Sequence, residues 1–492
     1  MSRKRGVGRW GAVALVVGML GVLLVAPAQA APTPPSLRLI QTQTEQTVNR
    51  RSAGAWIRVD PRVWATPVNG TFDVRVARAD YDEKYRITQV IAAGRNEVAQ
   101  ERALPGDIVA RDGLARFVRV TVRNADGDLV KRTPLRTFCP NSYEPQRAAP
   151  EGPDNPRFPY GCWLHHFAFS HVWGIDEGWA TRVLDYGGVR FRGPDGRYRV
   201  TVSIARRYVD LFQIAPKDAR ASVAVTVRTR SGSSEGMAVS HVGQSTAAGE
   251  GQLPKHPRVR TVKRAPSRNL PDLASLPAWG IRAAHVRGRD LLRFAANVWV
   301  GGTSRLDVEG FRRQGEDVMD AYQYFYRGDE VVARARVGTM HFHRKRGHNH
   351  WHFTDFARYR LLDDSRTAAV RSHKQSFCIV PTDSIALALP DAEWRPGYDT
   401  ACGWEDAMWV RQVLPIGWGD TYYQGVAGQA FNITNVPNGT YYVEVTANPG
   451  GRLFETDTSN NVTLRKVVLK GRSGARTVCV PPYTADPSRS GC

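Results

Sequence analysis

Hydrophobic and polar residues alternate in short runs along most of the chain, and no long segment has the 3.6-residue period of a helix. An alternating run places every second side chain on one face of a β-strand. The tetrapeptide Asn124-Ala125-Asp126-Gly127 directly follows such a run and is typical of a hairpin turn. The clearest runs are residues 71–76, 117–122, 196–202, 221–227, 291–294, 321–325 and 440–445.

This pattern predicts an all-β protein, with an antiparallel β-sandwich at 270–470 preceded by a second β-sandwich-like domain at 31–228. Residues 229–269 are rich in Ser, Gly, Arg and Pro, and we expect an interdomain linker there. Residues 471–492 are expected to form a loop-like C-terminal tail. Residues 196–202 resemble residues 439–445, so the first domain is either a diverged copy of the second or shares general β-sandwich preferences.

The N-terminus has the features of a secretory signal peptide, predicted at residues 1–30. A basic start is followed by an apolar stretch and by Ala28-Gln29-Ala30, which is a small-residue cleavage site. No second apolar span follows, so we expect a secreted, extracellular protein with no membrane span after signal removal.

All six cysteines lie in the exported part, where disulfides persist. They fall into three short intervals. Neighbour pairing is the simplest prediction, giving Cys139 with Cys162, Cys378 with Cys402 and Cys479 with Cys492.

The composition limits the classes of partner. With 42% hydrophobic residues and 13 Trp, the chain can bury substantial cores. The formal charge of +22 is carried mostly by Arg and favours loose association with anionic envelope polymers. No nucleic-acid-binding motif accompanies this charge, so specific nucleic-acid binding is not expected.

Three histidines, His348, His350 and His352, occupy alternate positions. On a β-strand they would project from one face, and neutral imidazole is the commonest metal ligand. Three nitrogens with an open position suit copper, zinc or iron, and copper binds most tightly of these. The alternative is a basic surface patch, because residues 344–346 are Arg-Lys-Arg.

The histidine run is followed along the chain by three further motifs: Ser372-His373-Lys374-Gln375-Ser376-Phe377-Cys378, Asp420-Thr421-Tyr422 and Glu455-Thr456-Asp457-Thr458-Ser459-Asn460-Asn461. With these four motifs in family order, residues 271–469 resemble the catalytic domain of the lysyl oxidase family, of a secreted, bacterial type. In that family three alternating histidines hold copper(II), which implies His348, His350 and His352 here. A lysine and a tyrosine are cross-linked into lysyl tyrosylquinone, which by motif implies Lys374 and Tyr422, with Tyr423 as the alternative tyrosine.

The resemblance implies a copper-dependent amine oxidase. Such an enzyme uses molecular oxygen to convert primary amines, including the ε-amines of peptidyl lysine, to aldehydes, with release of ammonia and hydrogen peroxide. The quinone carbonyl condenses with the amine, and a base then removes the α-proton. Asp355 is the candidate base, and its alternative role is to orient a ligand histidine.

The family resemblance also implies a calcium site built from two distant segments. Carboxylates, amide oxygens and a backbone carbonyl are the hard ligands that calcium prefers. The alternative is a polar β-turn at 457–461. The implied ligands are Asp272, Leu273, Glu455, Asp457, Asn460 and Asn461.

Two departures from the animal family members bear on these assignments. Animal members carry a Trp-His pair before the copper strand, where this chain has Met340-His341-Phe342-His343. A family histidine proposed as the base corresponds to Arg358. The competing hypotheses are a non-catalytic, metal-binding β-sandwich protein of the cell envelope and, less favoured, a metal-dependent hydrolase.

Overall fold

The structure is a computed structural model that describes residues 33–91, 100–184, 188–230, 259–344, 349–371, 374, 376–397, 402–426, 428–483 and 492. The predicted signal peptide at 1–30 and most of the predicted linker lie outside the described residues. The chain divides into two compact units, Met1–Thr33 and Pro34–Cys492. All strands lie in the second unit.

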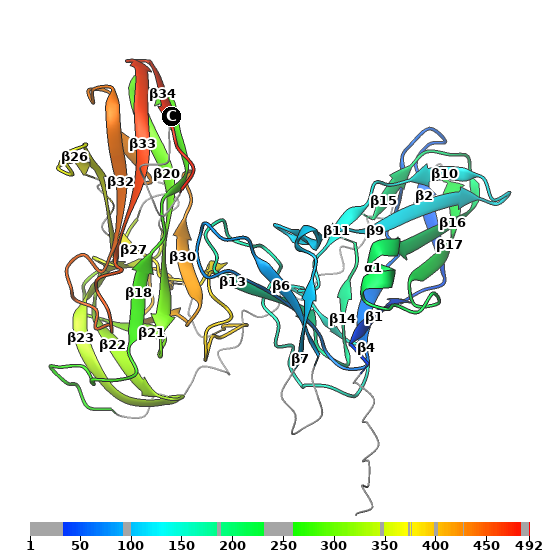
Figure 1. Cartoon of the computed structure of the whole chain (residues 1–492), viewed down its shortest axis with the longest axis horizontal. Coiled ribbons are helices and arrows are strands. Elements are labelled where there is room, and N and C mark those ends of the chain that lie inside the picture. Colours follow the sequence, from blue (N-terminus) through cyan, green and yellow to red (C-terminus); the bar gives the residue numbers. More distant parts are fainter. Residues whose placement is uncertain are drawn as a thin grey trace, which may run out of the picture. The chain divides into compact units, whose positions relative to one another are not determined.

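The first half of this unit consists of sheets ordered β1-β4-β14-β12, β10-β9-β16-β17-β2, β13-β5-β6-β7 and β15-β3, with β8 and β11 paired to β9 (Figure 1). Pairing is antiparallel except between β17 and β2. The elements are β1 Ser36–Gln41, β2 Glu45–Arg50, β3 Ile57–Val59, β4 Val63–Val68, β5 Phe72–Ala77, β6 Arg86–Ile91, β7 Gln100–Leu104, a 3-10 turn Gly106–Ile108, β8 Val109–Ala110, β9 Gly113–Asn124, β10 Leu129–Arg132, β11 Arg136–Phe138, β12 Gln146–Arg147, β13 Ser170–Ile175, β14 Trp179–Arg182, β15 Val189–Phe191, β16 Gly196–Ile204, α1 Arg206–Leu211 and β17 Arg220–Thr229.

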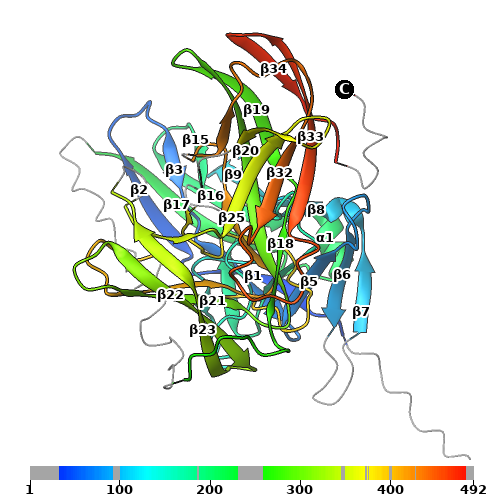
Figure 2. The same ribbon diagram turned by 90° about the vertical axis from the view of Figure 1, so that its left-hand side faces the viewer.

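The second half has three antiparallel sheets, ordered β18-β20-β30-β28 with β19 and β31 on β20, β27-β24-β23-β22-β21-β29, and β26-β25-β32-β33-β34. Figure 2 shows β25, β32 and β33 side by side. The strands are β18 Pro271–Ser275, β19 Trp279–Val286, β20 Arg289–Gly302, β21 Leu306–Arg312, β22 Val318–Arg327, β23 Glu330–Phe342, β24 Trp351–Thr354, β25 Ala357–Leu362, β26 Ala368–Arg371, β27 Ser376–Phe377, β28 Asp383–Ser384, β29 Trp409–Leu414, β30 Trp418–Tyr422, β31 Ala430–Asn432, β32 Gly439–Ala447, β33 Val462–Arg472 and β34 Ala475–Cys479.

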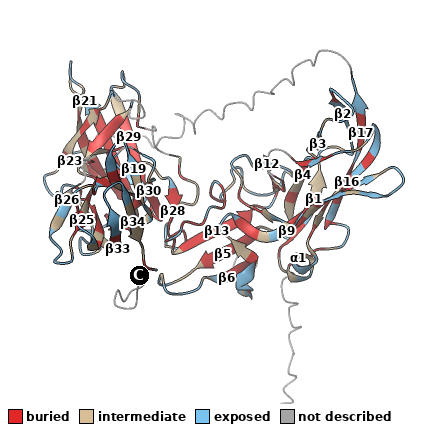
Figure 3. Cartoon of the chain, turned by 90° about the horizontal axis from the view of Figure 1, so that it is seen from above, coloured by how far each residue is buried: buried red, intermediate tan, exposed pale blue. Residues whose placement is uncertain are grey.

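Burial follows the alternation seen in the sequence. One apolar cluster is formed by the first half, with Phe72, Phe117 and Tyr208 among its fully buried rings. A second lies between the sheets of the second half and includes Phe294 and Phe377. Strands buried on both faces, such as β13 and β29, are coloured almost wholly as buried in Figure 3.

The all-β, antiparallel sandwich prediction is therefore confirmed. The only α-helix among the described residues is α1, and no helix in that part of the chain is long and apolar enough to cross a membrane. The predicted hairpin joins β9 and β10, where the Gly127 amide donates to the Asn124 carbonyl at 3.2 Å. The tail prediction was wrong at Ala475–Cys479, because this short alternating run pairs with β33 as an edge strand.

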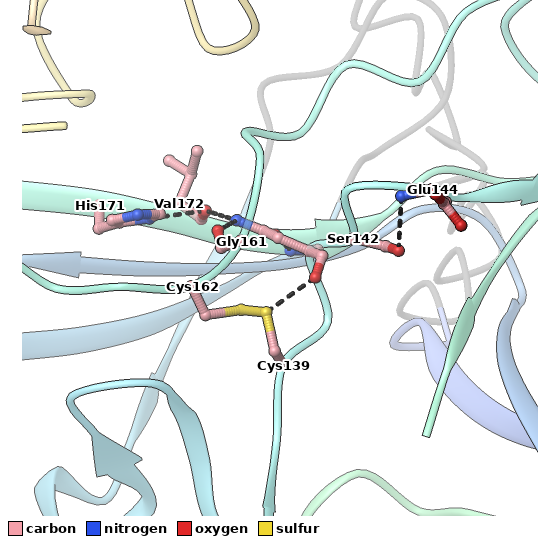
Figure 4. The surroundings of a disulfide bond; sticks show 9 residues. Cys139, Ser142, Glu144, Gly161, Cys162, His171 and Val172 are labelled. Atoms are coloured by element: carbon pink, nitrogen blue, oxygen red, sulfur yellow. Dashed lines mark hydrogen bonds between the residues drawn. A yellow bond between two sulfur atoms is a disulfide. The ribbon is translucent and has the colours of Figure 1, made fainter. Parts of the chain in front are cut away.

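All three predicted disulfides are present. Figure 4 shows the first, Cys139–Cys162, with Gly161 and Val172 nearby. The side-chain amide of the buried Asn141 donates to the carbonyls of Gly161 and Val172. Gly161 directly precedes the second cysteine, and Val172 lies on β13 after it, so the disulfide and the Asn141 amide hold the same parts of the chain together.

The two sequence segments that resemble each other adopt the same local structure. The Tyr198 hydroxyl donates to the Pro194 carbonyl at 2.6 Å, and the Tyr441 hydroxyl donates to the Pro437 carbonyl at 2.9 Å. Each tyrosine lies on the middle strand of an antiparallel trio, β9-β16-β17 or β25-β32-β33. Such tyrosine corners recur in β-sandwiches, so duplication stays a prediction.

Truncation of the ring at the centre of the second core should destabilise the protein strongly. Phe294 is fully buried, stacks on Phe431 at 4.8 Å and meets Tyr359 edge-on at 5.3 Å. Phe294→Ala should lower the free energy of unfolding by about 3–5 kcal/mol, measured from the urea midpoint. The control Val462→Ala, at a side chain 47% exposed, should change it by less than about 0.5 kcal/mol. Equal midpoint shifts would contradict this core assignment.

Candidate active site

Strand β30 carries two of the residues in the Asp-Thr-Tyr motif on one face. Because side chains alternate along a strand, Asp420 and Tyr422 point to one side and Thr421 to the other. Thr421 accepts a hydrogen bond from the Asn297 side-chain amide at 2.8 Å. Asp420 is 2% exposed, and Tyr422 packs against the second apolar core. The motif therefore directs one carboxyl and one phenol toward the interior of the sandwich.

Lys374 lies against this face, although it is 48 residues away in the sequence from Tyr422. Its side chain is buried, and Nζ lies 4.2 Å from the centroid of the Tyr422 ring and 4.9 Å from that of Phe377. A Cβ atom at Gly428, whose φ is +85°, would lie only 3.1 Å from the Cβ of Lys374. The glycine therefore leaves the space that the lysine occupies.

The Tyr422 phenol is held by the backbone of Cys378. Its hydroxyl donates to the Cys378 carbonyl at 2.9 Å and accepts from the Cys378 amide at 2.9 Å. The Phe377 ring meets the Tyr422 ring edge-on at 5.1 Å. Since Cys378 is also bonded to Cys402, the disulfide fixes the segment that orients the phenol.

Burial perturbs the proton equilibria of all three groups. Burial lowers the pKa of Lys374 to about 8, although the negative charge of Asp420 opposes the shift. Burial, followed by the Asp420 charge and the neighbouring Tyr359, raises the pKa of Tyr422 well above its usual range. Burial likewise raises the pKa of Asp420, against the opposing charge of Lys374. Apolar surroundings thus favour the neutral amine, phenol and carboxyl.

The histidine motif lies at the start of β24, in the sheet ordered β27-β24-β23-β22-β21-β29. Strand β24 starts only at Trp351, so His352 lies on the strand, His350 precedes it, and His348 lies outside the described residues. The His350 and His352 ring centroids are 4.4 Å apart. The His343 ring lies 4.7 Å from His352. The expected single alternating strand is thus shorter than the motif, yet two of its imidazoles remain together.

The spacing of these rings fits a shared metal ion. When two imidazole nitrogens bind one ion at about 2 Å, with a nitrogen–metal–nitrogen angle of about 90–110°, the two ring centroids lie roughly 4.5–5 Å apart. The His350–His352 and His343–His352 spacings lie in or beside that range. Within the described ranges, no group of three or more His, Cys, Asp or Glu side chains is placed to hold an ion. The described imidazoles are therefore compatible with part of a metal site.

Strand pairing brings the histidine and lysine segments together. Phe353 of β24 pairs with Phe377 of β27, three residues after Lys374. The adjacent Trp351 receives support from the same disulfide, because its amide donates to the Cys402 carbonyl at 3.0 Å. One disulfide-linked framework therefore positions both motifs.

Asp355, the candidate base, occupies a different position. It lies in the turn between β24 and β25 with a φ of +66°. Its carboxylate pairs with Arg452 at 3.4 Å, and its side chain is 30% exposed. No hydrogen bond or ion pair found among the described residues joins Asp355 to Lys374 or Tyr422. The structure thus gives no direct support for a role of Asp355 at the phenol.

Tyr423 points away from Lys374. It is 46% exposed, and its hydroxyl lies 3.4 Å from a carboxyl oxygen of Asp383. The strand alternation that directs Tyr422 inward directs its neighbour outward. Of the two tyrosines weighed in the sequence, Tyr422 is the one that faces the lysine.

The six residues expected at the calcium site meet at one place. Asn460 donates to both Asp272 carboxyl oxygens at 3.1 and 3.0 Å, and Asn461 donates to Glu455 at 2.9 Å. The Leu273 amide donates to Glu455 at 3.1 Å. The amide oxygens of Asn460 and Asn461 are buried without a hydrogen-bond partner among the described residues. Asp457, which accepts from the Ser459 amide at 2.8 Å, also forms the alternative polar turn.

Burial raises the pKa of Glu455, and its proximity to Asp272 adds to that shift. Two adjacent carboxyls and two unsatisfied amide oxygens form a site rich in hard oxygen donors. A divalent cation would satisfy all four groups if the side-chain amides rotated.

Three residues with a place in this arrangement were not assigned a role from the sequence. Asp420 could have been found from the alternation in Asp-Thr-Tyr, which puts it beside Tyr422. His343 could have been found from its alternation with His341 before the main motif. Gly428 gave no comparable signal, because its close approach to Lys374 depends on the fold.

The comparisons with known proteins concern this half of the chain. The model of the family described as "Lysyl oxidase" matches residues 328–479. Lysyl oxidase homolog 2 of Gallus gallus is 33% identical over 116 residues, covering 23% of this chain and 13% of that relative. Lysyl oxidase homologs 2 and 3 of Homo sapiens are each 31% identical, covering 23% of this chain and 13% and 14% of those relatives. The chain thus spans a small part of the length of its curated relatives, and the similarity supports the family for this segment.

The buried placement of Lys374 predicts an unusual titration. In metal-free protein, the amine should titrate near pH 8, because burial disfavours the ammonium form. Reductive methylation with a ¹³C label would follow the titration by NMR, and Lys374→Arg would identify the resonance. A midpoint at the ordinary lysine value of 10.5 would contradict the burial of this side chain.

Proposed function

We propose that the protein is a secreted, copper-dependent amine oxidase of the lysyl oxidase type, with lysyl tyrosylquinone formed from Lys374 and Tyr422. The observation that carries the proposal is the distance of 4.2 Å between Nζ of the buried Lys374 and the Tyr422 ring centroid. The family similarity over residues 328–479 supports it. In this proposal His348, His350 and His352 hold copper(II).

The quinone supplies an electrophilic carbonyl and accepts two electrons from a primary amine, and molecular oxygen takes those electrons up again. Substrates are primary amines, including ε-amines of protein lysine. Products are the aldehyde, ammonia and hydrogen peroxide.

The chain's own residues prepare both precursors. Lys374 is neutral above about pH 8, and only the neutral amine has a lone pair to bond to the Tyr422 ring. Cys378 fixes the rotation of the phenol through two backbone hydrogen bonds. Phe377 packs against both groups and excludes water from one side.

The proposed location is extracellular, in line with the predicted signal peptide and the oxidising conditions that three disulfides need. The basic surface would associate loosely with anionic envelope polymers. A non-catalytic metal-binding protein would use the histidines and leave the buried lysine and phenol without a role. The oxidase proposal accounts for both sets of residues.

Replacing the tyrosine that faces Lys374 should separate cofactor formation from metal binding. Tyr422→Phe should abolish quinone absorbance and the reaction with phenylhydrazine while copper content stays at the wild-type value, because no proposed copper ligand is changed. The matched control Tyr423→Phe removes a neighbouring phenol that points away from Lys374 and should keep both signals. Loss of copper from Tyr422→Phe would contradict the assignment of Tyr422 as the quinone precursor. So would the opposite pattern, in which Tyr422→Phe retains the quinone and Tyr423→Phe loses it.

We also propose that calcium binds at Asp272, Leu273, Glu455, Asp457, Asn460 and Asn461. The two buried amide oxygens without partners support this proposal, because an unsatisfied buried acceptor costs about 1–3 kcal/mol. A cation would supply the missing interaction and join β18 to the loop before β33.

Calcium should therefore stabilise the folded protein. At a calcium concentration 100 times Kd, the gain would be about 2.7 kcal/mol, seen as a rise in Tm that a chelator reverses. Asp272→Asn should remove most of the rise, whereas Asp406→Asn, at an exposed carboxyl, should retain it. A wild-type Tm that does not respond to calcium would contradict the site.

A further inference from the structure

The inner face of β30 carries a buried carboxyl that neither cofactor precursor accounts for. Asp420 is 2% exposed, and its Oδ2 atom has no hydrogen-bond partner within the described part of the chain. Burial of an unsatisfied carboxyl oxygen is costly, so such a group is rare in an apolar core unless it has a function. By strand alternation it points to the same side as Tyr422.

Four titratable groups interact with Asp420 electrostatically. The positive charge of Lys374 and the polar interaction with Tyr422 favour its ionised form, while the charge of Asp383 disfavours it. Burial raises the pKa of Tyr359, and the charge of Asp420 adds to that shift. Burial exceeds the other effects and raises the pKa of Asp420. A carboxylate with a raised pKa is a stronger base at neutral pH than an exposed one.

We propose that Asp420 is the general base of amine oxidation, taking the proton from the substrate carbon that bears the amine nitrogen. This proposal rests on the proposed function and names a catalytic residue of the same site. In the step, the substrate C–H bond breaks and an O–H bond forms on Asp420. The electron pair of the broken bond would pass through the amine nitrogen, condensed with the quinone carbonyl, and reduce the cofactor by two electrons, which molecular oxygen would later take up.

The position of Tyr422 at the end of β30 suits this role. Tyr422 keeps part of its surface exposed, whereas Asp420, two residues earlier, is sheltered. Tyr422 is thus nearer the surface than Asp420, which remains in apolar surroundings. Shelter from water preserves the basicity of the carboxylate.

The other candidates are less well placed. Asp355 pairs with Arg452, is 30% exposed and lies in the turn between β24 and β25 rather than on β30. The guanidinium group of Arg358 has hydrogen-bond donors and no acceptor. Among these three residues, Asp420 alone shares a strand face with Tyr422.

The test compares full-length, copper-loaded wild type with Asp420→Asn, Asp420→Glu and Asp355→Asn. The control Asp383→Asn changes a buried carboxyl on β28 that interacts with Thr421, on the other face of β30. Three quantities are measured: the yield of the cross-linked Lys374–Tyr422 peptide by mass spectrometry, kcat with n-butylamine, and the kinetic isotope effect with its α,α-dideuterated form.

Asp420→Asn should retain the cross-link and lose about 10²–10⁴-fold in kcat, with an increased isotope effect because proton removal becomes rate-limiting. Asp420→Glu should recover part of the rate with an altered pH profile, which a merely structural role would not produce. In wild type, kcat/KM should fall as the pH drops through the raised pKa of Asp420. Asp383→Asn should stay within a few-fold of wild type.

A kcat for Asp420→Asn within tenfold of wild type, or a larger loss in Asp355→Asn, would overturn the proposal. If neither Asp420 variant forms the cross-link, the residue serves cofactor formation or folding, and the assignment as base is also overturned. Failure of the proposed function would instead be seen in wild type, as the absence of any cross-link.

Discussion

The burial of one lysine against one tyrosine ring is the constraint on which the rest of this site depends. A shift in the pKa of Lys374 from 10.5 to about 8 corresponds to on the order of 3 kcal/mol that disfavours the charged form. The fold maintains this unfavourable placement with the Cys378–Cys402 disulfide, the β24–β27 pairing and the space left by Gly428. Perturbed, buried titratable groups of this kind gather at functional sites.

The same framework connects the lysine to the histidines. The Cys378 backbone orients the Tyr422 phenol, and the Cys402 carbonyl accepts from the amide of Trp351, which directly precedes His352. A single disulfide therefore connects the backbone segments that contact the phenol and the histidine strand. Copper chemistry at the histidines and ring chemistry at Tyr422 would need such fixed proximity, because misplacement of reacting groups by about 1 Å costs roughly 10²-fold in rate.

Much of this was readable in the sequence. Two-residue alternation predicted the antiparallel sandwich, and the three cysteine intervals predicted the disulfides. Motif order selected Lys374 and Tyr422, and the fold brings these two residues together. It also selected the acidic and Asn residues of the expected calcium site, which lie in two distant segments and meet in the structure. Local pattern was insufficient where tertiary contacts decide. The strand at Ala475–Cys479 exists because β33 offers an edge, and the histidine strand starts only at Trp351. Asp420 differs from Asp355 in burial and neighbours, which no spacing in the sequence reveals.

The most direct test of the account is peptide mapping of protein produced without copper and then exposed to copper and air. The account predicts that the separate peptides carrying Lys374 and Tyr422 disappear and that one cross-linked peptide containing both residues replaces them. Both peptides remaining separate in copper-loaded protein, with no cross-linked species, would contradict it.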